Sequence, residues 1–389
     1  MDSVRSVALG VWFRQGRIHE PEDEHGISHL LEHMVFKGTH RRTALELAFD
    51  IERLGGSVDA YTTHEATAFQ ARVPDHALSE ALDVLTDLAF EPRLSARDLE
   101  PERQVILEEL TAIEESPEDL AFELQAAFMY DGHPYGEPII GSRESVENIG
   151  RGALVDLHHR AYHPGRSVIV AAGHVDHVDL LELLGRYMPR DRNGTAPEPA
   201  TTPSPGSGGR RVEQPNARQA HIVAGGLTVP YRDPLRYAIV LVNTALGGGM
   251  SSRLFQTIRE ERGLAYSVYS FHSFLAGAGH AGAYAGTSPE TSEETRELLL
   301  EQLRDVAENG LTPDEIDATK RQLKGRLLLS LETPGARMSR LAGLALYGQS
   351  YRTLDQIAER IEAITVDQVR EASQLLHPDR LAVLELLPA

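Results

Sequence analysis

The chain has 389 residues and a formal net charge of −20, and it contains no cysteine. This length exceeds what one hydrophobic core usually supports, so we expect two domains. The lack of cysteine excludes disulfides, thiolate zinc sites and cysteine nucleophiles, and the negative charge argues against a nucleic-acid partner. The charge would suit a chamber that attracts basic peptides, but an ordinary acidic surface is the simpler interpretation.

Hydrophobic residues make up 41% of the chain and charged residues 25%, the proportions of a soluble globular protein. No apolar run is long enough to span a membrane. The first residues, MDSVRSVALGVWF, lack the basic and apolar regions of a signal peptide. We therefore expect a cytoplasmic protein with no membrane partner.

The first half of the chain alternates between strand and helix patterns. Residues 6–13 read as a buried strand, and a helix that carries His29 follows. The next expected elements are a helix from Thr43 to the Gly55-Gly56 pair and a hairpin of strands at 57–62 and 66–73. Helices are then expected at 76–90, 95–115, 118–130 and 144–161. A strand at 167–173 and a helix at 176–187 end this half.

Residues 189–211 are rich in Pro, Gly, Ser and Thr and are expected to form a linker between domains at 1–188 and 212–389. The second half repeats the style of the first, with strands at 219–225, 266–272, 279–286 and 381–386 and helices at 232–246, 252–262, 289–308 and 312–333. The predicted fold class is α+β: two similar α/β-layered domains, each a mainly antiparallel sheet with helices on one face.

The residues with the clearest chemical meaning are His29, Glu32 and His33, in the pattern H-x-x-E-H. Histidines four apart share one face of a helix and can hold one metal ion, and the glutamate can reach a ligand in the open position of that metal. The apolar residues between them would anchor the helix, with Gly38 as its C-cap. Two histidines on a helix are also common on a solvated face, so the metal interpretation needs a third ligand.

The predicted helix at 95–115 offers acidic candidates for that ligand. Glu102 and Glu109 are seven residues apart and share a face, whereas Glu108 points about 100° away. Solvated glutamates on an ordinary amphipathic helix would show the same periodicity. The periodicity alone therefore leaves the third ligand open.

Three separated stretches resemble the pitrilysin-type inverzincins, in the short-chain branch that includes the mitochondrial processing peptidase and its bacterial relatives. They are HGISHLLEHMVFKGT at 25–39, ERQVILEEL at 102–110 and SSRLFQTIREERGLAYSVYSF at 251–271. The resemblance implies a zinc endopeptidase that cleaves peptides or short unfolded segments in a closed chamber. It implies that His29, His33 and Glu109 hold Zn²⁺, that Glu32 is the general base and that Glu102 supports the site.

The same resemblance extends to the second half of the chain. Arg259 and Tyr266 have the spacing of the family's Arg/Tyr pair, which would donate hydrogen bonds to the substrate carbonyl and the oxyanion. The strand at 66–73, with Asp59-Ala60-Tyr61-Thr62 before it, resembles the family's exposed edge, to which an extended peptide would add. From the residues alone, an ordinary surface pair and an internally paired strand remain open.

Two departures from the family pattern are visible. His25 stands where relatives more often have Asn, and it could be misread as a ligand. The family's further strand before residue 6 is not in the sequence, so either the true start lies upstream or that sheet edge is bare. In the second case we expect the 6–13 strand to lie near a sheet edge.

Two other functions compete with the peptidase interpretation. A non-catalytic partner subunit of the same family would typically lack the metal motif, which is present here. A zinc nucleobase deaminase would need cysteine ligands. The resemblance further implies a dimer, because family members with four domains on one polypeptide form a clamshell from two such halves. By this resemblance the two-domain chain would form a homodimer, or a heterodimer with a related subunit, whose partner supplies the second half of each site.

Overall fold

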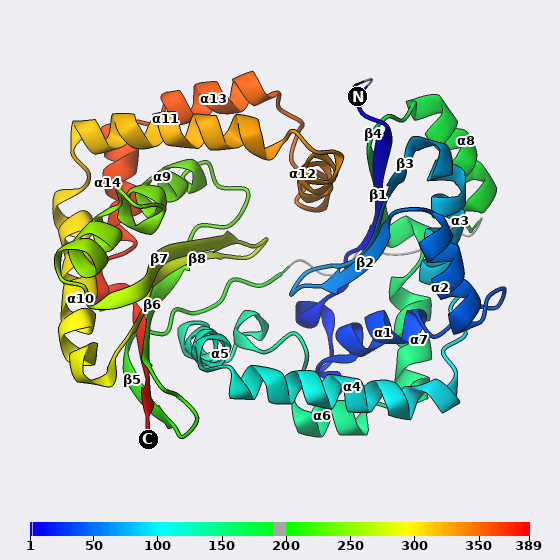
Figure 1. Ribbon diagram of the computed structural model, residues 1–389, viewed down its shortest axis with the longest axis horizontal. Helices are drawn as coiled ribbons and strands as arrows, with labels where there is room; N and C mark the ends of the chain where they lie inside the picture. Colours follow the sequence, from blue (N-terminus) through cyan, green and yellow to red (C-terminus); the bar gives the residue numbers. More distant parts are fainter. Residues whose placement is uncertain (2, 190–199) are drawn as a thin grey trace. The chain divides into compact units, whose positions relative to one another are not determined.

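The computed structural model describes residues 1, 3–189 and 200–389 (Figure 1). These residues form two compact units, each made from three stretches of the chain. The first unit comprises Met1–Leu110, Pro138–Glu198 and Ser330–Tyr351, and the second comprises Thr111–Glu137, Pro199–Leu329 and Arg352–Ala389. Residues 111–137 precede the expected linker at 189–211 but belong to the second unit. Residues 330–351 follow that linker but belong to the first unit. Residues 190–199 of the expected linker lie outside the described part.

The first unit contains a four-stranded antiparallel sheet in the order β2-β3-β1-β4. Its strands are β1 (Ser6–Phe13), β2 (Ser57–Thr62), β3 (Thr67–Pro74) and β4 (Ser167–Gly173). Its helices are α1 (Ile27–Val35), α2 (Ala44–Arg53), α3 (Leu78–Phe90), most of α4 (Ala96–Glu115), α6 (Arg143–Asn148), α7 (Arg151–Ala161), α8 (His177–Tyr187) and α12 (Pro334–Leu346). The strand β1 lies inside the sheet, so the expectation that residues 6–13 lie near an edge is wrong.

Alternating side chains of β1 face two different helical layers. Phe13 points to one side, where its ring contacts those of Phe90 and Tyr162. Trp12 points to the other side and packs with Met338 and Ala342 of α12. Since successive strand residues face opposite sides, this alternation buries both faces of the sheet. The helix α12, from late in the chain, thus covers the face opposite α3 (Figure 1).

The second unit contains a five-stranded sheet in the order β5-β9-β6-β8-β7, antiparallel except for the parallel pair β5 and β9. Its strands are β5 (Gly208–Gln214), β6 (Ala220–Thr228), β7 (Ala265–Phe274), β8 (Gly279–Thr287) and β9 (Ala382–Pro388). Its helices are α5 (Pro117–Met129), α9 (Arg236–Gly247), α10 (Ser292–Asn309), α11 (Pro313–Ser330), α13 (Leu354–Glu362), α14 (Val366–Gln374) and a π-helical segment (Phe255–Glu261). The strand β5 begins inside the segment that we expected to be only a linker.

The second sheet is also covered on both faces. One face packs on α9, α10 and α14 around buried residues such as Leu241, Leu303 and Val369. The other packs on α5, where Ala121 meets Val223. The predicted α+β class with mainly antiparallel sheets is confirmed. In addition to the main helical layer, each sheet has a helix from the other half of the sequence on its second face.

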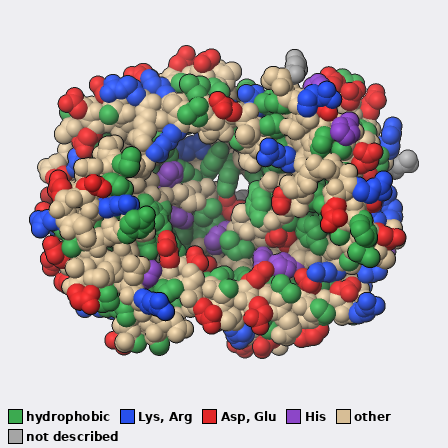
Figure 2. Space-filling view, viewed as in Figure 1, with side chains coloured by type: hydrophobic (Ala, Val, Ile, Leu, Met, Phe, Trp, Pro, Cys, Tyr) green, Lys and Arg blue, Asp and Glu red, His purple; other side chains and the backbone are tan. Residues whose placement is uncertain are grey.

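On the face of the molecule that Figure 2 shows, acidic side chains are spread among Lys and Arg rather than gathered in one patch. This agrees with the simpler interpretation of the net charge as a solvated acidic surface. Among the residues that the structure describes, no helix is long and apolar enough to cross a membrane.

Candidate metal centre

The helix α1 is fixed by an apolar stripe and by a carboxylate at its first turn. Ile27, Leu30 and Met34, on its inward face, are fully buried. The Glu20 carboxylate accepts hydrogen bonds from the backbone N–H groups of Gly26 at 2.9 Å and Ser28 at 2.8 Å. These donors would otherwise be unsatisfied at a helix start, so Glu20 caps α1. Sequence reasoning missed Glu20, because its loop position carries no periodic signal.

The helix presents His29 and His33 side by side, with their ring centroids 4.7 Å apart. Glu109 reaches them from α4: its Oε2 lies 3.9 Å from His29 Nε2 and 3.7 Å from His33 Nε2. Each of the three residues offers one ligand atom, and these atoms all lie within 4.8 Å of one another. Glu108 is exposed and lies outside this group. The structure thus brings together the two histidines and the glutamate that the family resemblance selects.

The donor set has the chemistry of a zinc site. Burial, reinforced by the neighbouring His33, lowers the pKa of His29 to about 4, so its ring is neutral near pH 7. A neutral imidazole is the form that binds a metal. Two imidazoles and one carboxylate match a catalytic zinc centre with one position left for water.

Glu102 lies behind the histidines rather than among the metal-facing atoms. Its Oε2 is 3.4 Å from His33 Nδ1, the ring nitrogen on the side away from Glu109. The other carboxylate oxygen of Glu102 pairs with Lys37 Nζ. A carboxylate in this position orients a metal-binding imidazole and fixes its tautomer.

Glu32 projects from the same helix and is 8% exposed. Burial raises the pKa of its carboxyl, and a hydrogen bond from Thr62 partly offsets this. The Thr62 hydroxyl donates to Glu32 Oε2 at 2.6 Å. A carboxylate with a raised pKa is a better proton acceptor, as a general base requires.

Arg259 and Tyr266 belong to the second unit and lie against each other. Arg259, in the π-helical segment, donates from Nη1 to the backbone oxygen of Tyr266 at 2.9 Å. Its guanidinium carbon lies 4.3 Å from the centre of the Tyr266 ring. Tyr266, near the start of β7, is 77% exposed. The arginine therefore braces a tyrosine whose ring is open to solvent.

Comparison with known proteins places the chain in a family. Residues 2–143 match the family described as "Insulinase (Peptidase family M16)", and residues 148–323 match "Peptidase M16 inactive domain". A Bacillus subtilis (strain 168) protein, "Uncharacterized zinc protease YmxG", is 34% identical over 100% of this chain and 94% of its own length. A Mycobacterium leprae (strain TN) protein, also named an uncharacterized zinc protease, is 37% identical over 97% of this chain and 86% of its own. The chain belongs to peptidase family M16.

Two solved structures share the M16 fold of this chain. A crystal structure titled as a peptidase M16 inactive domain from Pseudomonas fluorescens superimposes with a TM-score of 0.92, at 24% identity, over 100% of this chain and 93% of that one. A protease from Helicobacter pylori gives a TM-score of 0.89 at 21% identity, over 98% of this chain and 94% of that one. At these identities the likeness shows the fold alone.

Two residues near the H-x-x-E-H pattern, His25 and Gly38, lie outside the group of metal-binding residues. His25 Nε2 lies 2.9 Å from the backbone oxygen of Pro138, and His25 is not among the grouped metal-binding residues. Gly38 does not cap α1, which ends at Val35 with Phe36 as its C-cap. Gly38 instead adopts a φ of +110°, and a Cβ there would lie 2.9 Å from the backbone oxygen of Arg42. This glycine therefore serves the turn after the helix.

The strand at 66–73, where we expected the peptide-binding edge, lies inside the sheet. The strand β3 pairs with β2 on one side and with β1 on the other, so it has no free edge. The free edge on this side of the sheet belongs to β2, whose last residue is Thr62. The hairpin was predicted correctly, and the alternative that the sequence left open, an internally paired strand at 66–73, is the one that the structure shows.

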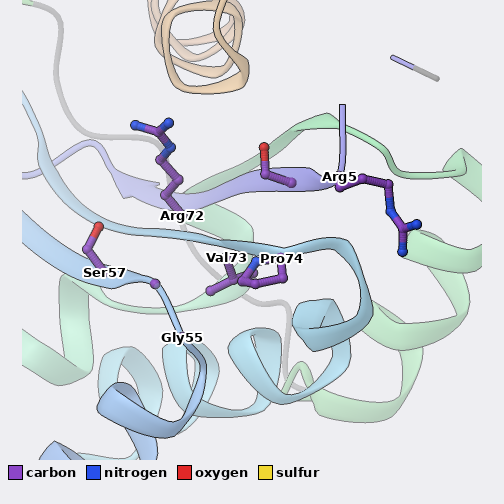
Figure 3. Close-up of a pocket in the computed structure, with 8 residues that line it drawn as sticks. Arg5, Gly55, Ser57, Arg72, Val73 and Pro74 are labelled. Carbon is purple, nitrogen blue, oxygen red and sulfur yellow. The ribbon is translucent and has the colours of Figure 1, made fainter. Parts of the chain in front are cut away.

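A surface pocket of about 360 Å³ lies at the other end of β2, around Gly55 and Ser57 (Figure 3). Its two arginines, Arg5 and Arg72, point in different directions. Arg5 is paired with Asp75, at 2.7 Å between Nε and Oδ2. The pocket therefore has no convergent set of polar groups, and the metal centre remains the candidate functional site of the first unit.

Proposed function

We propose that this chain is a zinc-dependent endopeptidase that cleaves peptides or short unfolded segments. The observation that carries the proposal is the set formed by His29, His33 and Glu109, whose ligand atoms lie within 4.8 Å of one another beside the buried Glu32. Membership of peptidase family M16 and relatives named zinc proteases support both the metal and the reaction class.

In this proposal His29 Nε2, His33 Nε2 and a Glu109 oxygen hold Zn²⁺. The bound ion would supply Lewis acidity and lower the pKa of a coordinated water to about 7. Glu32 would accept the proton of that water on its carboxylate and pass it to the leaving amine. Glu102 would hold His33 in its binding tautomer, through the contact with Nδ1.

Substrate binding is proposed at β2 and at the Arg259–Tyr266 pair. An extended peptide would add to the free edge of β2, so that backbone hydrogen bonds give affinity and side-chain pockets give preference. Tyr266, exposed and braced by Arg259, would donate from its hydroxyl to the oxyanion. We further propose that two chains enclose one chamber and that each supplies this pair to the zinc site of its partner.

The deciding experiment combines metal analysis with a quenched-fluorescent peptide assay, with and without chelator. We expect one zinc ion per chain and chelator-sensitive cleavage. Glu32→Gln should keep the zinc and lose nearly all turnover, because only the base is removed. His29→Ala, His33→Ala and Glu109→Ala should each lose zinc.

The matched control is Glu108→Ala, which changes a neighbouring exposed glutamate outside the metal group. It should keep both zinc and activity. Loss of zinc in Glu108→Ala but not in Glu109→Ala would overturn the ligand assignment. A wild-type chain that binds zinc and peptides without cleaving them would favour the non-catalytic partner subunit instead.

A further inference from the structure

The last residue of the free edge strand touches the proposed general base. Thr62 ends β2, and its Oγ1 lies 2.6 Å from Glu32 Oε2. A hydroxyl this close to a carboxylate donates a short, charge-assisted hydrogen bond. Glu32 makes no other side-chain hydrogen bond within the part of the chain that the structure describes. The orientation of its carboxylate therefore depends on one donor.

The donor is itself held in place by buried neighbours. Thr62 pairs with Thr67 in the β2–β3 hairpin, and the two hydroxyl oxygens are 3.4 Å apart. Thr67 is fully buried, and its hydroxyl donates to the backbone oxygen of Gln15 at 2.8 Å. The side chain of Gln15 in turn donates from Nε2 to the hydroxyl of Ser28, on α1, at 3.1 Å. These contacts tie the hairpin end to the helix that carries Glu32.

We propose that Thr62 is the positioning residue of Glu32. By holding Oε2, it leaves the other carboxylate oxygen to meet the water that is to be deprotonated. The inference rests on the proposed peptidase function and deepens it. A general base must lie within hydrogen-bond reach of its proton in a defined geometry, and small displacements cost about 100-fold in rate.

The position of Thr62 also joins substrate binding to the base. The same residue ends the edge strand to which a peptide would add and fixes the carboxylate that acts on that peptide. The distance between the scissile bond and the base is therefore set within one strand end. In an alternative role, the hydroxyl would only stabilise the end of the hairpin through its neighbour Thr67, but that contact is 3.4 Å long, against 2.6 Å to Glu32. The hydroxyl instead donates to Glu32.

The test compares Thr62→Val and Thr62→Ser with the wild-type zinc enzyme in the quenched-peptide assay. Valine keeps the shape and the β-branch of threonine but removes the donor, whereas serine keeps the donor. We expect Thr62→Val to lower kcat by about 10- to 100-fold with KM changed by less than about twofold. Thr62→Ser should stay within about threefold of wild type in kcat.

Zinc content, melting temperature and a crystal structure of Thr62→Val supply readouts other than activity. Both variants should hold one zinc per chain, and the valine variant should show the Glu32 carboxylate displaced from its wild-type orientation. The matched control is Thr86→Val, which removes a buried hydroxyl that donates to the backbone oxygen of Leu82 inside α3. It should leave kcat unchanged.

An unchanged kcat in Thr62→Val, or an undisplaced Glu32, would overturn the inference while the peptidase function stood. A fall in zinc content, or a serine variant as weak as the valine one, would show that Thr62 acts through the structure of the site and would also overturn it. A wild-type enzyme with no chelator-sensitive cleavage would instead refute the proposed function.

Discussion

Arg253 joins three segments of the second unit, and replacing it should cost a measurable share of that unit's stability. It precedes the π-helical segment and donates two hydrogen bonds to Glu315 on α11, at 2.6 and 2.8 Å. It also donates to Asp305 on α10 and to the backbone oxygen of Gly310, between these two helices. The arginine side chain is only 17% exposed. Arg253→Met would leave two carboxylates without this partner.

The size of the loss follows from the proton affinity of Glu315. The hydrogen bonds from Arg253, opposed by burial and assisted by Thr312, lower the pKa of Glu315 from 4.5 to about 2. That lowering corresponds to about 3 kcal/mol of preference for the ionised form in the folded state. Solvent screening at a carboxylate that is 30% exposed, and the share that belongs to Thr312, reduce the part lost with Arg253 to about 2 kcal/mol.

The effect has a definite pH dependence. The pKa of Glu315 is lower in the folded state than in the unfolded state, so its stabilisation is complete above about pH 4.5. It is lost as the pH falls from there toward 2. The difference in unfolding free energy between wild type and Arg253→Met should therefore be the same at pH 7 and pH 5.5 and should shrink at pH 3.5. Urea denaturation followed by far-UV circular dichroism measures this difference.

Arg262→Met is the matched control, because Arg262 pairs with Glu294 at 3.5 Å and both side chains are more than half exposed. Such surface pairs contribute less than about 1 kcal/mol. A double-mutant cycle with Glu315→Gln should give a coupling of about 1–2 kcal/mol for the Arg253 pair. An Arg253 variant no less stable than the Arg262 variant, or a coupling below about 0.5 kcal/mol, would refute the reasoning.

Three further predictions concern packing, assembly and helix propensity. Met338→Ala should destabilise the first unit by about 2–4 kcal/mol, because Met338 packs against the sheet and is only 3% exposed. The control Leu45→Ala, at a side chain that is 66% exposed, should change the free energy of unfolding by less than about 0.5 kcal/mol. The fluorescence of the single tryptophan, in the first unit, reports this change during denaturation, and equal costs for the two variants would contradict the packing of α12. Homodimers of Glu32→Gln and of Tyr266→Phe, each inactive or impaired, should regain activity when they are mixed and allowed to exchange chains, because each mixed dimer then contains one intact site. Confirmed mixed dimers without recovered activity would exclude an active site shared between chains. Gly152→Ala should raise the free energy of unfolding by about 0.5–1 kcal/mol, and so the melting temperature slightly, because this α7 glycine has open space where the new Cβ would lie. A lower melting temperature in a thermal scan would count against this.

Elements with a strong local period could be predicted from the sequence. The β1 and β4 strands occur where they were predicted, the β2–β3 hairpin occurs where the alternation indicated, and the apolar stripe of α1 is buried as expected. The predicted helix at 144–161 is instead two helices, because Ile149 leaves the helical conformation and Gly150 caps a new start. Periodicity does not detect a break that is set by two residues in the middle of a polar stretch.

Pairings between distant segments could not be predicted in this way. The strand β5 begins with Gly208-Gly209, has little burial and looks like part of the linker. It exists because β9, the last strand of the chain, supplies its hydrogen bonds in a parallel pair. The helix α12 likewise shows an apolar face through Met338 and Ala342, but nothing local says which sheet it covers. Tertiary contacts decide both cases.

The candidate site divides along the same line. The histidine pair lies four residues apart on one helix, so a local pattern places it. Glu109 comes from another helix, and only the family resemblance separated it from its neighbour Glu108. Thr62 and Glu20 reach α1 through tertiary contacts alone, one to the proposed base and one to the helix start. Their hydroxyl and carboxylate types are common at strand ends and in loops, so the sequence carried no distinguishing signal for either.

The different burial of the three proposed ligands suggests how the site is organised. His29 and His33 are 18% and 19% exposed on a helix whose apolar side is fully buried and whose start is capped by Glu20. Glu109 is 43% exposed. Ordering an exposed side chain costs conformational entropy that buried side chains have already lost on folding. The two imidazoles therefore form the part of the site that folding prepares, and the carboxylate is the ligand whose freedom metal binding must restrict.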